Sequence, residues 1–100
     1  MINMRETPRT SPGDKIVAKW DGMNFMERLN LIMANENLFW VMRLITRSEI
    51  ARLHHMRESA REYVAEREDH PFFASLELKQ TVEAQAHRDK LKAALQAVFM

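Results

Sequence analysis

The chain has 100 residues, a length that suits one domain. Its formal charge is +1, and cations and anions are nearly equal in number in both halves. This balance argues against the basic surface of a protein that binds phosphate backbones or anionic membranes. The absence of cysteine excludes disulfides, thiolate metal sites and cysteine nucleophiles. The sequence has neither a secretory leader pattern nor an apolar run of bilayer length, so we expect a cytoplasmic protein.

The distribution of glycine and proline indicates the fold class. No glycine follows Gly22, and Pro71 is the one proline after that point. Alanine, leucine, methionine, glutamate, arginine and lysine fill the remainder, and these residues are strong helix formers. We therefore predict an all-α protein, a small bundle of about four helices. Residues 1–10 are expected to form a flexible arm, and residues 11–100 a single helical domain.

The first two helices have recognisable ends. The Ser-Pro-Gly-Asp sequence at 11–14 is typical of a helix start, and Gly22 is expected to end this helix in the left-handed conformation. Asn24 and Glu27 form a capping-box pattern, which predicts a second helix at 25–34. Its inward face is expected to carry Phe25, Met26, Leu29, Ile32 and Met33. Its polar face is expected to carry Glu27, Arg28 and Asn30.

The next segment is apolar around its whole circumference. Asn35 and Asn37 favour a bend or break, and in residues 38–45 only Arg43 is charged. A helix of this kind is buried on all sides, or is buried on one side and covers a partner with the other. A capping-box pattern at 46–49 either starts a new helix or lies inside one continuous helix over 38–68. The sequence does not decide whether this segment is core or interface. It also does not decide whether residues 38–68 form one helix or two.

The C-terminal third is expected to form one more helix. Asp69 and His70 followed by Pro71 should end the preceding helix, and the last helix is predicted over 71–97. We expect these two helices to pack as an antiparallel hairpin. Gln80 and His87 interrupt the apolar stripe of the last helix. They could fix the register of packed helices, or they could lie at the edge of the stripe in solvent.

The segment from Thr46 to Leu53 resembles the opening of a helix-turn-helix unit, because a polar cap precedes an acidic, an aliphatic and an alanine residue. The resemblance then ends. His55 stands where the tight turn normally has glycine, and Arg61 stands where a second buried aliphatic residue is expected. We interpret the segment as an ordinary capping box on an amphipathic helix.

A set of histidines and carboxylates forms a second candidate site. Its members are His54, His55, Glu58, Glu62 and Glu66. His55 and Glu58 resemble half of a helical di-metal site in reverse order, but such sites need about six inward-facing ligands from four helices. No second matching half is present in the sequence. We therefore expect this set to be a solvated face, and we predict neither a metal nor a cofactor.

The apolar segment is the strongest candidate for a functional surface, because tryptophan, methionine and arginine are common at interface centres. The predicted binding residues are Phe39, Trp40, Arg43, Leu44 and Arg47. We predict a small non-enzymatic regulator, an adaptor or an inhibitor, that occupies a partner protein's surface. In size and lack of motifs it is similar to small phage or plasmid regulators. A homodimer is also expected, since so much apolar surface on a short chain needs cover.

The alternative function is that of a nucleic-acid-associated regulator. It would use the degenerate helix-turn-helix-like segment at 46–64, and its cations would be Arg43, Arg47, Arg52 and Arg57. The balanced charge of the chain favours the protein-binding hypothesis over this one.

Overall fold

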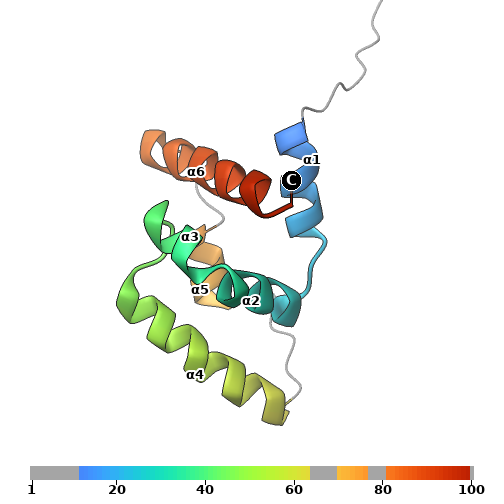
Figure 1. The fold of residues 1–100 in the computed structure, drawn as a ribbon, viewed down its shortest axis with the longest axis vertical. Helices are drawn as coiled ribbons and strands as arrows, with labels where there is room; N and C mark the ends of the chain where they lie inside the picture. Colours follow the sequence, from blue (N-terminus) through green and yellow to red (C-terminus); the bar gives the residue numbers. More distant parts are fainter. Residues whose placement is uncertain (1–11, 64–69, 77–80, 100) are drawn as a thin grey trace, which may run out of the picture.

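The computed structural model describes residues 12–63, 70–76 and 81–99, and these residues form helices and no strand (Figure 1). The helices are α1 (Pro12–Asp21), α2 (Phe25–Ala34), α3 (Glu36–Val41), α4 (Arg47–Tyr63), α5 (Pro71–Leu76) and α6 (Val82–Phe99). The predicted all-α class is confirmed. The described part of the chain contains six helices where the sequence predicted about four. The predicted arm at 1–10 lies outside the described residues.

The first helix ends differently from the prediction. Helix α1 ends at Asp21, and the N–H of Gly22 donates to the carbonyls of Ala18 and Lys19. Gly22 does not have a positive φ, so the predicted left-handed cap is wrong. A side chain satisfies carbonyl groups at this helix end instead. Arg28 donates from Nε to the carbonyl of Trp20 at 3.1 Å and from Nη2 to that of Asp21 at 3.2 Å.

Helix α2 spans the predicted range. The side chain of Asn24 accepts from the N–H of Glu27 at 2.8 Å, and Glu27 Oε1 accepts from the N–H of Asn24 at 2.9 Å. This reciprocal pair is the predicted capping box. Arg28 was expected on the polar face, but its side chain is buried. Burial is tolerated because its donors reach the carbonyls at the end of α1 and its guanidinium lies 5.2 Å from the ring centre of Trp20.

The segment predicted as one or two helices over 38–68 is two helices in its described part. Helix α3 ends at Val41, and α4 begins at Arg47. The N–H of Glu49 donates to Thr46 Oγ1 at 3.2 Å, and Glu49 Oε1 accepts from the N–H of Thr46 at 2.8 Å. The capping box at 46–49 therefore starts a new helix, as one of the two alternatives proposed.

The predicted helix over 71–97 is also interrupted. Helix α5 ends at Leu76, and α6 begins after Thr81, whose Oγ1 accepts from the N–H of Ala84 at 3.0 Å. The N-terminus of α5 is capped by His70, whose Nδ1 accepts from the N–H of Phe72 at 3.1 Å. Serine, threonine, aspartate and asparagine are the usual capping residues, so a histidine cap is easily missed in a sequence.

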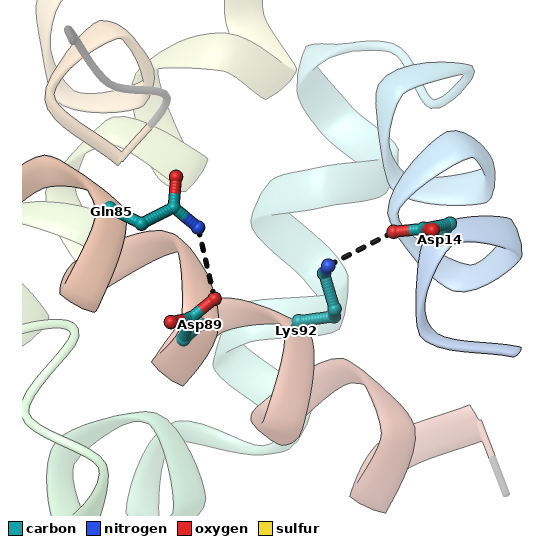
Figure 2. A network of polar contacts seen from close by, with 4 residues as sticks. All are labelled: Asp14, Gln85, Asp89 and Lys92. Carbon is teal, nitrogen blue, oxygen red and sulfur yellow. Dashed lines mark hydrogen bonds and ion pairs between the residues drawn. The ribbon is translucent and has the colours of Figure 1, made fainter. Parts of the chain in front are cut away.

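The helices pair in a different way from the predicted hairpin. Helix α6 packs mainly against α1, and α4 packs mainly against α2 (Figure 1). The contact between α6 and α1 includes an ion pair, in which Lys92 Nζ lies 2.9 Å from Asp14 Oδ1 (Figure 2). Gly13 lies so close to the side chain of Lys92 that a Cβ atom there would stand 2.7 Å from Lys92 Cδ. Helices α1 and α6, which are far apart in the sequence, therefore pack side by side.

The core lies where α1, α2 and α5 meet. Trp20, Phe25 and Phe73 are buried, and the ring of Phe73 lies near both others, with ring centres 5.1 Å apart for Phe25 and Phe73 and 6.4 Å apart for Trp20 and Phe73. Aromatic pairs at such distances add to the stability that burial provides. Leu53 from α4 and Leu95 from α6 are fully buried around this centre, so most helices contribute to one core.

Candidate binding surface

The surface begins with the turn that ends α3. The N–H of Arg43 donates to the carbonyl of Trp40, and the N–H of Leu44 donates to the carbonyl of Phe39, both at 2.9 Å. This is the Schellman pattern of a helix C-terminus, in which the residue after the cap is left-handed and is usually glycine. Here that residue is Arg43, with a φ of 62°. The turn sends the chain back toward the core.

The turn divides the predicted binding residues between the core and the surface. Phe39 is 0% exposed and Leu44 is 4% exposed, so neither is available to a partner in this structure. Trp40 is 39% exposed, and Arg43 and Arg47 are exposed. The apolar circumference proposed for 38–45 is therefore mostly satisfied within the chain. Phe39, Leu44 and Ile45 face inward because the turn after Val41 folds the segment over them.

Val41 was not among the predicted binding residues, yet it is 64% exposed beside Trp40. Helical spacing distinguishes the exposed Trp40 and Val41 from the buried Phe39. The inward stripe of α2 runs Phe25, Leu29 and Ile32, and steps of four and three carry it through the half-buried Glu36 to position 39. Position 40 follows Glu36 by four and lies at the edge of this stripe, whereas position 41 lies off it, in agreement with their exposures of 39% and 64%. We call the exposed set Trp40, Val41, Arg43 and Arg47 the Trp40 patch.

A cation–π contact joins the two helices of the patch. The guanidinium carbon of Arg47, at the start of α4, lies 4.5 Å from the ring centre of Trp40 in α3. Such contacts are worth about 0.5–1 kcal/mol at exposed sites. An energy of this size favours the orientation of the indole that faces Arg47.

Two open pockets flank this contact, and Trp40 and Arg47 border both. The larger has a volume of about 580 Å³, and its lining residues are Trp40, Val41, Arg43, Ile45, Thr46 and Arg47. The smaller has a volume of about 250 Å³, and its lining residues are Glu36, Asn37, Trp40, Arg47 and Ile50. The described residues that line the larger pocket include two guanidinium groups and no carboxylate. In the smaller one, Glu36 Oε2 lies 3.5 Å from His54 Nε2.

The histidine and carboxylate set forms no metal site in the part of the chain described. His54, His55 and Glu58 are exposed on α4. The side chains of Glu62 and Glu66 lie outside the described residues. Among the described residues, no group of three or more histidine, aspartate or glutamate side chains could hold a metal ion.

Of the two polar residues that interrupt the C-terminal apolar stripe, the structure describes only His87. Gln80 lies outside the described residues. His87 is half-buried on α6, and its Nε2 atom is buried without a hydrogen-bond partner. Burial and the nearby charge of Lys90 lower the pKa of His87 from its ordinary value of 6.5, although Glu49 acts in the opposite direction. Nothing in its surroundings makes it part of the Trp40 patch.

The helix-turn-helix resemblance does not continue into the structure. Helix α4 is continuous from Arg47 to Tyr63, so the chain makes no turn at His55. Arg52 is exposed on α4, whereas Arg57 is half-buried with its Nε atom enclosed and unpartnered. Of the four cations named for nucleic-acid binding, only Arg43 and Arg47 share one patch.

Comparison with known proteins does not extend these observations. No protein-family model, no curated protein and no solved structure matches the chain. Within the described residues, no helix is both long enough and apolar enough to cross a membrane. The Trp40 patch is therefore interpreted on its geometry alone.

Proposed function

We propose that the protein is a small non-enzymatic regulator that binds a partner protein through the Trp40 patch. The observation that carries this proposal is the adjacent exposure of Trp40 and Val41, at 39% and 64%, in a segment whose Phe39, Leu44 and Ile45 are buried. Large apolar side chains next to one another on a surface are typical of interaction sites. The proposal includes no catalytic step, because it rests on contact between surfaces.

Binding would take place by burial of the indole ring. Interface anchors are most often tryptophan, tyrosine or arginine, and truncating one commonly costs about 2 kcal/mol or more of binding energy. Trp40 and Arg47 supply such a pair in contact with each other. Because contact with Arg47 already favours one orientation of the indole in the free protein, less side-chain entropy is lost when a partner covers it. Occupying a partner's surface in this way is how an adaptor or an inhibitor acts.

The left-handed residue also supports the proposal. A non-glycine residue with positive φ costs free energy, and such residues concentrate at functional sites. Arg43 adopts this conformation at the edge of the patch, where its side chain lines the larger pocket. Glycine would relieve the strain but would remove the guanidinium. A binding role for that guanidinium gives a reason to keep arginine there.

The test compares two truncations of exposed apolar residues in the full chain. Trp40→Ala removes the anchor, and Val82→Ala, at a residue that is 88% exposed outside the patch, is the matched control. We expect the wild-type chain and the Val82 variant to retain the same partner from an extract of the native host. The Trp40 variant should lose it. The purified partner should then bind the wild-type chain and the Val82 variant, and it should not bind the Trp40 variant.

Thermal unfolding of both variants keeps the result interpretable. Trp40 is 39% exposed and contacts Arg47, so its truncation should lower the unfolding temperature but leave the protein folded at the temperature of the binding assay. Equal retention of all partners by the Trp40 variant would show that the patch is not the binding surface. Loss of folding in that variant alone would show that Trp40 acts as a core residue.

Two further expectations remain proposals. A homodimer would bury less apolar surface than the sequence suggested, since Phe39, Leu44 and Ile45 are already buried within the chain. A cytoplasmic location is compatible with a chain that has no cysteine to pair in an oxidising compartment. The nucleic-acid alternative is left with two neighbouring cations on a chain of formal charge +1, which is weak support for binding phosphate backbones.

A further inference from the structure

We infer that the partner segment recognised by the Trp40 patch is an acidic peptide segment that carries an apolar side chain. This inference rests on the proposed function and specifies the chemistry of the partner. The carboxylates would pair with Arg43 and Arg47. The apolar side chain would enter the larger pocket beside Val41 and Ile45.

The charge of the larger pocket is the first argument. Among the described residues, its lining includes the guanidinium groups of Arg43 and Arg47 and no carboxylate. No carboxylate of the described residues forms an ion pair with either group. Two acidic residues at the start of α3 and α4 have other partners, since Glu36 lies 3.5 Å from His54 and Glu49 accepts from the N–H of Thr46. A chain of formal charge +1 therefore has a locally positive pocket.

The remaining bonding capacity of the two arginines is the second argument. A cation–π contact does not require the N–H donors of a guanidinium, so Arg47 can contact Trp40 and still receive a carboxylate in bidentate fashion. Arg43 is exposed at the turn, one residue beyond the cap of α3. The apolar component follows from Val41, Ile45 and the indole, which supply the other walls of the same pocket. The pocket thus calls for both an acid and an apolar group.

A second copy of the chain fits this pocket less well. A two-fold dimer contact brings the same patch of both copies together, so the arginines of each copy would face those of the other. Like charges placed opposite each other oppose association. A nucleic acid would meet only two cations here, too few for the many phosphate contacts that duplex binding uses. An acidic peptide brings no cations to face the two arginines, and one or two of its carboxylates suffice to pair with them in the larger pocket, away from Glu36 of the smaller one.

The test is a selection from a displayed library of random dodecapeptides on the immobilised full-length chain, followed by affinity measurement with synthetic copies of the enriched peptides. We expect the enriched peptides to contain aspartate or glutamate near a leucine, phenylalanine or similar residue. Arg47→Glu should weaken their binding by about tenfold or more, because it replaces attraction with repulsion. The variant should fold, since a carboxylate in the first turn of a helix is favourable.

Two controls separate the charge of the patch from charge in general. Arg61→Glu makes the same change at the far end of α4, about 21 Å along the helix from Arg47. It should leave peptide affinity unchanged. Replacing glutamate by glutamine in the selected peptide should abolish the difference between the wild-type chain and the Arg47 variant.

The possible outcomes distinguish this inference from the proposed function. Enriched peptides without acidic residues that still need Trp40 would overturn the acidic partner and leave the protein-binding surface. Peptides that bind the Trp40→Ala variant as well as the wild type, or no enrichment at all, would count against both. A dimer mass by light scattering that Trp40→Ala reduces to a monomer would show that a second copy occupies the patch. Displacement of the selected peptide by duplex DNA would favour the nucleic-acid alternative.

Discussion

At the scale of single residues, Arg43 combines an unfavourable backbone with a useful side chain. The left-handed conformation places its Cβ close to the following carbonyl, and glycine is free of that penalty. Two hydrogen bonds at 2.9 Å and the burial of Phe39 and Leu44 hold the turn despite this cost. Packing of the surrounding residues therefore decides the conformation of Arg43 against its own preference.

We predict that Arg43→Gly stabilises the protein. The free energy of unfolding should rise by about 1 kcal/mol, because the left-handed strain is removed. Urea denaturation followed by circular dichroism measures the change. Arg47→Gly is the contrasting variant, and it should destabilise because position 47 lies in a right-handed helix. An unfolding midpoint for Arg43→Gly at or below that of the wild type would mean that the turn is unstrained.

Arg28 shows the same dependence on neighbours. On helical spacing alone it belongs to the polar face of α2, and most arginines in that position are exposed. The end of α1 offers two carbonyl groups, which accept from its Nε and Nη2 atoms, and the ring of Trp20, which lies beside its charge. None of these partners is visible from the spacing of residues within α2.

At the scale of helices, the boundary between α3 and α4 decides what the patch contains. The capping box of Thr46 and Glu49 starts α4 at Arg47, and this position brings the Arg47 guanidinium to the ring of Trp40. A continuous helix through this segment would place Arg47 seven residues beyond Trp40, about 10 Å along the axis. The cation–π contact therefore depends on the break between the helices.

We predict that Thr46→Ala weakens both the fold and the patch. Losing the hydroxyl that accepts from the N–H of Glu49 should lower the free energy of unfolding by about 1 kcal/mol. Thr46→Ser keeps a hydroxyl and should retain most of the stability. Chemical denaturation measures both variants. The indole fluorescence of a Trp20→Phe background reports whether the environment of Trp40 changes, and equal stability of the two variants would show that the cap contributes nothing.

At the scale of the whole molecule, stability should depend on pH through His87. The lowered pKa means that the unfolded chain takes up a proton on His87 before the folded protein does. The contribution of neutral His87 to the free energy of unfolding is therefore fully present above pH 6.5, the ordinary pKa of histidine. It is lost as the pH falls below 6.5 toward the lower pKa of the folded state. Desolvation of the ring is the main cause, with Lys90 adding to it and Glu49 opposing it.

We predict that His87→Gln reduces this dependence. Between about pH 7.5 and pH 5.5, the wild-type protein should lose more stability than the variant, because glutamine takes up no proton. The measurement is the free energy of unfolding by urea at each pH. His55→Gln removes an exposed histidine of α4 and is the control. Parallel curves for the wild type and the His87 variant would contradict the prediction.

Much of the fold was predictable because helix formation depends on neighbours close in sequence. The bounds of α2, the capping boxes at Asn24 and Thr46, and the all-α class all follow from residues within a few positions of each other. Trp40, Arg43 and Arg47 were predicted as binding residues from the apolar run that surrounds them, and the structure exposes all three. Phe39 and Leu44 were predicted with them and are buried, because the run alone does not say which side faces the core.

The sequence by itself determined that this chain is helical and where α1, α2 and α5 begin, since caps, glycine and proline act over a few residues. The tertiary structure alone decided the rest. It paired α6 with α1, buried Arg28, placed Arg43 in a left-handed turn and divided one apolar segment into core and surface. These outcomes depend on contacts between residues far apart in the chain, and packing free energy from such contacts overrides local preference.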